Sequence, residues 1–212
     1  MVINIPLYVQ ISGYSQIVPF LAALLIRRTD EKAIKVFSYL IIIAAIVNFV
    51  GMYFAFNSVS HLWLYHIYQP IEFAIFVYLF REWETVKDKW HDYIRILIVA
   101  FMFVDQLLLE DLNKFGMVGM VVQSLVTVTL ASRILWVLYT QSHIPILSDY
   151  RFYITAGTFL FFGINSISYV FINLFHIQIP LFVHSVSNIS TNLIFAYSFI
   201  CYYKRKRMIS MV

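Results

Sequence analysis

The residues best suited to chemistry lie in the stretch HLWLYHIYQPIEFAIFVYLF, residues 61–80. A helix would place four of its polar side chains on one face, because they recur at steps of four, three and four residues. These are His61, Tyr65, Tyr68 and Glu72. The rest of the stretch is apolar enough to cross a bilayer, so the carboxyl lies in mid-membrane, where Asp or Glu costs about 2.5–3.5 kcal/mol on insertion scales. Such a residue indicates a functional site with a partner.

Other predicted helices carry polar residues at depths that match this stripe. Counting about 1.5 Å of rise per residue, we predict a cavity that opens outward. The deeper layer holds Asn48, Tyr68, Gln69, Glu72, Gln123, Asn165, Asn188 and Asn192, and the mouth holds His61, Tyr65, Tyr169 and His184. In hydrocarbon an unsatisfied amide or carboxyl is costly, so these side chains should face one another or water.

Glu72 is expected to point into this cavity, with its carboxyl near Asn48, Asn165 or Asn188. No Lys or Arg lies at its depth, so desolvation predicts a neutral carboxyl at pH 7 that donates a hydrogen bond. An alternative is that the amides only join helices, since Asn, Gln, Ser and Thr bridge membrane helices at about 0.6 kcal/mol on average.

Three uses of such a cavity stay open. The first is binding or sensing of a small molecule or lipid. The second is metal-dependent hydrolysis of a lipid, with His61 or His66, His184 and Asp105 as zinc ligands, because these residues lie in the same shallow layer. The third is relay of protons or ions along the ladder of His61, Tyr65, Tyr68 and Glu72.

Several other chemistries are disfavoured. The chain has no G-x-S-x-G elbow for a serine nucleophile and no glycine-rich phosphate loop. Rhodopsins share a seven-helix layout, but no lysine stands between Pro180 and Tyr203, so no retinal Schiff base can form there. No cofactor is expected, apart from the zinc of the second alternative.

The composition indicates an integral membrane protein. Of the 212 residues 61% are hydrophobic and only 12% are charged, and the mean hydropathy is +0.79. Spans of about 20 residues account for nearly the whole chain, which predicts one all-α transmembrane domain over residues 1–212. The seven predicted spans cover residues 7–26, 36–56, 61–80, 93–109, 115–138, 152–174 and 181–203. Pro19 and Pro70 should kink their helices.

The basic residues predict the orientation of the spans. Fourteen of the 15 Lys and Arg residues lie in connectors on one side, and Lys114 lies alone on the other. The positive-inside rule puts the N-terminus outside and the C-terminus in the cytoplasm of a multi-pass cell-membrane protein. The tail residues Lys204, Arg205, Lys206 and Arg207 should attract anionic lipids of the inner leaflet. Because topology accounts for the pI of about 9.1, nucleic acid is not an expected partner.

Overall fold

Helices make up nearly all of the chain in the computed structural model, which describes residues 6–85, 87–112, 117–141, 145–175 and 180–209. The fold class is all-α, as the sequence predicts. The helices are α1 (Leu7–Ser15), α2 (Ile17–Ile26), α3 (Lys32–Phe56), α4 (Leu62–Trp83), α5 (Lys89–Val104), the π-helix η1 (Asp105–Leu109), α6 (Met117–Gln141), the 3-10 helix η2 (Ile146–Ser148), α7 (Tyr150–Phe175) and α8 (Pro180–Ile209).

Within these described residues the helices form seven rods, because α1 and α2 run on from one another and η1 continues α5. Helix α1 ends at Ser15 and α2 begins at Ile17. Pro19 lies in the first turn of α2 and cannot donate a backbone N–H to Ser15, which explains the break predicted there. Helix α4 continues through Pro70 without interruption. The rods match the seven predicted segments, with α8 extending beyond 203 through the basic tail.

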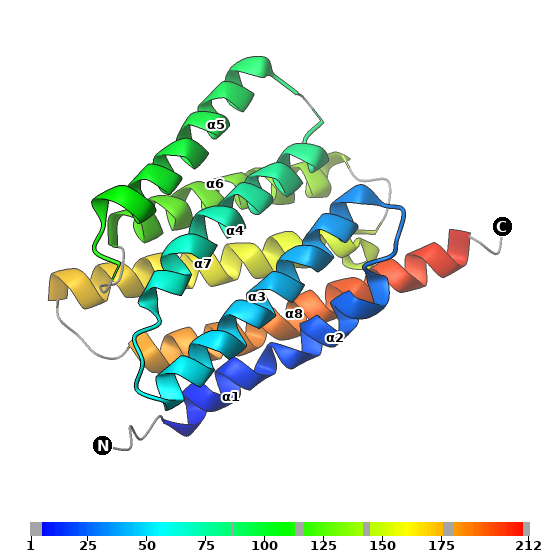
Figure 1. Cartoon of the computed structure of the whole chain (residues 1–212). Helices are drawn as coiled ribbons and strands as arrows, with labels where there is room; N and C mark the ends of the chain where they lie inside the picture. Colours follow the sequence, from blue (N-terminus) through cyan, green and yellow to red (C-terminus); the bar gives the residue numbers. More distant parts are fainter. Residues whose placement is uncertain (1–5, 86, 113–116, 142–144, 176–179, 210–212) are drawn as a thin grey trace.

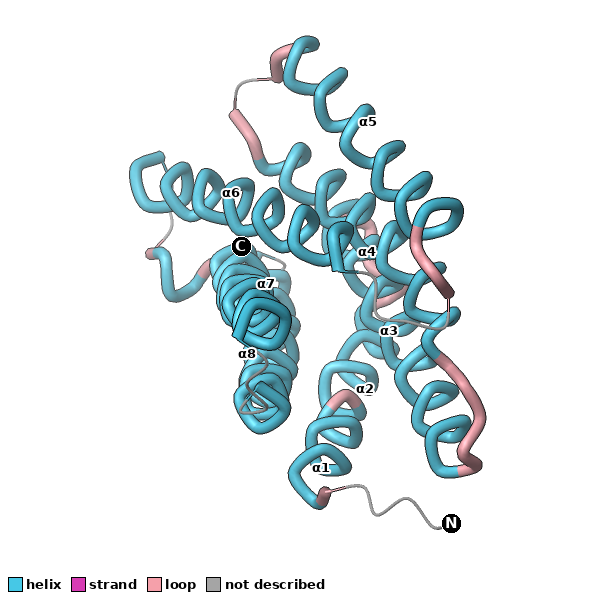
Figure 2. Tube along the Cα trace, turned by 90° about the vertical axis from the view of Figure 1, so that its left-hand side faces the viewer, coloured by secondary structure: helices cyan, strands magenta, loops and turns pink. Residues whose placement is uncertain are grey.

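Six rods close into a ring. In order around it, α1 and α2 pack on α3, α3 on α4, α4 on α6, α6 on α7, α7 on α8, and α8 returns to α1 and α2. Helix α5 lies outside this ring and packs on α4 (Figures 1 and 2). Helix α1 begins at one end of the bundle and α8 finishes at the other (Figure 1), which agrees with an odd number of rods.

Three of the rods are long and apolar enough to cross a membrane in the part of the chain that is described: Leu7–Ile26, Lys32–Phe56 and Val118–Gln141. Large apolar side chains such as Leu25, Leu97 and Trp136 are exposed on the outside of the bundle. Exposed apolar surface on this scale is unusual for a soluble monomer. The helices therefore have the character of membrane helices.

The basic connectors meet at one end of the bundle, on the right in Figure 1. The Tyr150 hydroxyl donates to Glu31, and the hydroxyls of Thr29 and Tyr202 share a hydrogen bond. Lys206 Nζ lies 4.0 Å from Asp30 Oδ2. These contacts tie the connector before α3 to the start of α7 and the end of α8.

An aromatic core fills the same end. Phe37 on α3 contacts Phe195 and Phe199 of α8, with ring centroids 5.1 and 5.4 Å apart. The Tyr150 ring lies edge-on to those of Trp83 and Tyr202. Aromatic side chains therefore close this end of the bundle, which we call the basic end. The polar residues predicted to line the cavity, such as His61 and Asn188, lie toward the opposite end.

Candidate functional site

A cavity of about 320 Å³ lies inside the ring of helices. All six ring rods contribute to its wall, and α5 does not. Its polar lining consists of Gln16, Asn48, His61, Tyr65, Tyr68, Gln69, Glu72, Gln123, Ser124, Asn165, His184, Asn188, Thr191 and Asn192. Below these, toward the basic end, the wall is apolar and includes Leu40, Ile41, Phe76, Phe162 and Phe195. The cavity thus has a polar section and an apolar section.

The four polar residues that share one face of the predicted helix, His61, Tyr65, Tyr68 and Glu72, all line this cavity. Glu72 receives a hydrogen bond from the Tyr68 hydroxyl at 2.8 Å on Oε1 and one from Gln123 Nε2 at 3.3 Å on Oε2. The expectation that its partner would be Asn48, Asn165 or Asn188 is wrong. Helix α6 brings Gln123 to the carboxyl, while each of those asparagines is engaged by another helix.

The asparagines join neighbouring rods through their amide nitrogens. Asn48 Nδ2 donates to the Gly13 carbonyl at 2.9 Å. Asn188 Nδ2 donates to Ser12 Oγ at 2.9 Å, and Asn192 Nδ2 donates to Ser15 Oγ at 2.7 Å. The amide nitrogens of these asparagines therefore join helices, which is the alternative role that the sequence suggests for them.

Two residues that line the cavity each have one buried atom without a hydrogen-bond partner among the described residues: Gln69 Oε1 and Thr191 Oγ1. Native proteins satisfy nearly all buried polar atoms with protein or water. Both residues line the cavity, but these two atoms are buried away from it, so the accessible polar groups of the wall are the ones that water or a ligand would meet.

The two histidines of the cavity have different surroundings. His184 Nδ1 lies 2.8 Å from Asn165 Oδ1, which joins α8 to α7. His61 precedes α4, and its ring lies 6.0 Å from that of Tyr65. A Cβ at Gly51 would lie 2.9 Å from the Tyr65 hydroxyl oxygen, so glycine at this position lets Tyr65 lie against α3. Tyr169 lies on α7, but its side chain is outside the part of the chain that the structure describes.

The residues proposed as metal ligands do not lie together. His61 and His184 line the cavity, whereas Asp105 and His66 are absent from its wall. In the described ranges no group of three or more His, Cys, Asp or Glu side chains has the placement of a metal site. Asp105 starts the π-helix η1, which packs on α4 and α6 away from the centre of the ring.

Asp105 belongs instead to a buried polar cluster that the sequence did not reveal. Its neighbour Gln106 is fully buried, and His66 Nδ1 lies 4.0 Å from Glu110 Oε2. A Cβ at Gly119 would lie 2.6 Å from Asp105 Oδ2 and 2.0 Å from Gln106 Nε2. Glycine at this position of α6 is what admits the cluster. The π-turn that rotates Asp105 and Gln106 inward has no signature in the sequence.

Comparison with known proteins gives no relative: no family model, no curated protein and no solved structure matches the chain. Function must therefore be argued from the cavity itself.

Proposed function

We propose that this chain is a seven-span integral membrane protein that binds a small amphiphilic molecule or lipid in the polar cavity centred on Glu72. The observation that carries the proposal is a cavity inside six helices whose wall is lined by polar side chains, Glu72 among them. Interhelical hydrogen bonding alone does not account for a cavity of about 320 Å³, because helices joined only for stability pack without one.

The orientation we propose has the basic end in the cytoplasm. The basic connectors share one end of the bundle, and the positive-inside rule puts that end inside. The polar section of the cavity lies toward the opposite end, so the ligand enters from outside. The N-terminus is then outside, the tail of Lys204 to Arg207 faces anionic inner-leaflet lipids, and the protein resides in the cell membrane.

The wall selects a ligand that donates hydrogen bonds. Glu72 provides the single carboxyl among the described lining residues, and neither Lys nor Arg is present there. The amide nitrogens of Asn48, Asn188 and Asn192 are already engaged by neighbouring helices. The described lining thus offers one carboxyl and uncharged hydroxyl and amide groups, which suits an amine or a set of hydroxyls better than an anion.

The apolar section of the cavity determines the chemistry of the rest of the ligand. Phe76, Phe162 and Phe195 line it, and the aromatic core closes it at the basic end. A hydrocarbon group attached to the polar head fits this section. A single-chain amphiphile with a cationic or hydroxylated head is the class that matches both sections.

The test is thermal unfolding of the protein in nanodiscs with three amphiphiles of equal chain length: an alkylamine, an alkyl glycoside and an alkyl carboxylate. We expect the amine and the glycoside to raise the transition temperature and the carboxylate to have no effect. Ala44→Phe fills the cavity and should abolish the rise. Ala100→Phe, at an exposed position of α5, is the matched control. Equal responses of the two variants would contradict the proposal.

Proton relay is a second candidate, supported by one contact. The Tyr68 hydroxyl and Glu72 are hydrogen bonded at 2.8 Å, so the inner step of the proposed ladder is formed. The relay predicts proton uptake by sealed vesicles that Tyr68→Phe abolishes, whereas ligand binding predicts none. Stoichiometric zinc in the purified protein would favour the hydrolase instead.

A further inference from the structure

An apolar slot of about 210 Å³ lies on the other side of α4, between α5 and α6. The apolar part of its wall consists of Phe73 and Val77 of α4, Ile94 and Ile98 of α5, and Val126 and Leu130 of α6, and His91 of α5 also lines it. In the described part of the chain α5 packs along α4 but not along α6, and the two helices diverge in Figure 1. The slot is the space that this divergence leaves.

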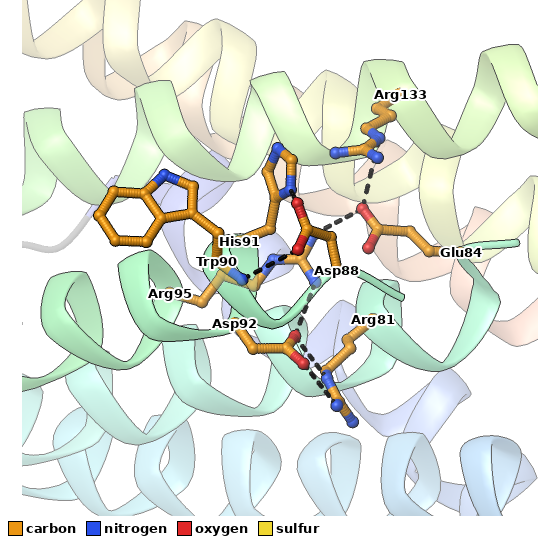
Figure 3. A network of polar contacts seen from close by, with 8 residues as sticks. All are labelled: Arg81, Glu84, Asp88, Trp90, His91, Asp92, Arg95 and Arg133. Atoms are coloured by element: carbon orange, nitrogen blue, oxygen red, sulfur yellow. Dashed lines mark hydrogen bonds and ion pairs between the residues drawn. The ribbon is translucent and has the colours of Figure 1, made fainter. Parts of the chain in front are cut away.

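The basic end of the slot carries cationic side chains. Arg95 of α5 and Arg133 of α6 both line it there. Between them lies the buried carboxylate of Glu84, which accepts a hydrogen bond from Arg95 Nη2 at 2.5 Å and lies 3.5 Å from Arg133 Nε (Figure 3). Arg95 is buried, whereas the Arg133 side chain is 42% exposed.

Most charged side chains of this cluster are already paired with one another (Figure 3). Arg81 forms two hydrogen bonds of 2.6 Å with the Asp92 carboxylate (Figure 3). Asp88, a third carboxylate of this cluster, lies 3.0 Å from His91 Nδ1 (Figure 3). Among the described residues Arg133 contacts Glu84 through Nε, and neither of its Nη atoms has a hydrogen-bond partner. A guanidinium with free donors suits a phosphate, which it binds in a bidentate manner.

Trp90 marks the depth of this cluster in a bilayer. Its side chain is 68% exposed at the start of α5, where Asp88 accepts a hydrogen bond from the Trp90 backbone N–H. Exposed indoles of this kind lie at the level of lipid headgroups. If Trp90 lies at the headgroup level, Arg133 lies beside the lipid phosphates and the apolar slot lies beside the acyl chains.

We propose that the slot between α5 and α6 holds one acyl chain of an anionic phospholipid whose phosphate binds the Arg133 guanidinium. The proposal rests on the membrane location proposed above, but its ligand and its site differ from those of the cavity. Basic pockets between helices on the cytoplasmic side bind anionic headgroups. The tail from Lys204 to Arg207 is also basic but has no apolar slot beside it. It therefore attracts anionic lipids without binding a single lipid molecule at a defined site.

The experiment is native mass spectrometry of delipidated protein in detergent with added phosphatidylglycerol, phosphatidylcholine or glycerol 3-phosphate. We expect one phosphatidylglycerol to be retained and the other two not. Arg133→Ala should lower its occupancy roughly tenfold, as loss of a charge-assisted hydrogen bond predicts. Lys204→Ala, at an exposed cation of the tail, should leave it unchanged.

A second pair of variants tests the slot without changing charge. Thr129 and Ser132 are both exposed on α6 and both donate to the carbonyl four residues earlier, but only Thr129 lines the slot. Thr129→Trp should displace the lipid, and Ser132→Trp should not. Ala44→Phe should leave the occupancy unchanged, so the cavity and the slot proposals can fail separately.

Three outcomes would overturn the proposal. Glycerol 3-phosphate that binds as well as the lipid means that the site takes a phosphate without a chain. A Lys204→Ala effect equal to that of Arg133→Ala means that attraction by the whole basic end explains retention. Equal effects of Thr129→Trp and Ser132→Trp mean that no chain occupies the slot.

Discussion

Replacing Glu72 with alanine or glutamine separates the hydrogen bonds of its carboxyl from its role in ligand binding. In Glu72→Ala the Tyr68 hydroxyl and Gln123 Nε2 lose their acceptor. An unsatisfied buried polar group costs about 1–3 kcal/mol. Both groups line the cavity, where water can replace the carboxylate, so we expect about 1–3 kcal/mol in total rather than for each group. At about 2–4 °C per kcal/mol for a chain of this length, the transition falls by roughly 2–12 °C.

Glu72→Gln should leave stability nearly unchanged. The amide keeps the volume and an acceptor oxygen for Tyr68, and the Gln123 amide can turn its oxygen to the new NH₂ group. The assay is thermal unfolding in nanodiscs of the protein and both variants, with and without the alkylamine. We expect Glu72→Gln to unfold like the unmodified protein but to lose stabilisation by the amine. Two variants that are both fully stable and fully responsive to the amine would refute the central role of Glu72.

Two further predictions concern the contacts of η1 with α6 and of α5 with α4. Gly119→Ala should destabilise the protein by about 1–3 kcal/mol, because the added Cβ overlaps Gln106. The control Gly163→Ala, whose Cβ meets no atom closer than 3.9 Å, should be neutral or stabilising by about 0.5–1 kcal/mol. Equal effects of the two variants on thermal unfolding would contradict this prediction. The Arg81 guanidinium holds the pKa of Asp92 below its usual value, so their pairing stabilises the fold above about pH 4 and is lost as the pH falls through the lowered pKa. Asp92→Asn should therefore lower the transition temperature at pH 7 and have no effect once the pH is below that pKa; a difference that is independent of pH would contradict the pairing.

Periodicity was sufficient to predict the elements and the inward stripe. Apolar runs of span length set the seven rods, and steps of three and four residues put Tyr65, Tyr68 and Glu72 on one face. The missing N–H of Pro19 predicted a kink where α1 ends and α2 begins. Pro70 lacks the same N–H, yet α4 continues through it.

The partners of these residues could not be predicted, because they depend on which helices are neighbours. Gln123 reaches Glu72 since α6, rather than α5, completes the ring beside α4. The sequence gives no reason for α5 to lie outside. Asp105 was expected near His61 and His184 at the outer part of the cavity. Because α5 and η1 lie outside the ring, Asp105 lies in a separate cluster with Gln106.

The connector at residues 81–93 also carries more structure than its composition suggests. Its charges and the residues Trp83 and Trp90 are typical of a segment that lies in the headgroup region. The pairing of Arg95 with the buried Glu84, eleven residues away in sequence, requires that α4 and α5 pack with a specific register, which charge composition alone does not specify.

The most direct test of an outward-opening cavity is labelling of single cysteines in intact cells with a membrane-impermeant maleimide. In a Cys201→Ala background, we predict labelling of Asn188→Cys on the cavity wall. Val186→Cys, on the same helix but facing outward from the bundle, should not react because it lies in hydrocarbon, and Lys204→Cys should react only after the membrane is opened. Labelling of Lys204→Cys in intact cells together with protection of Asn188→Cys would contradict both the orientation and the entrance of the cavity.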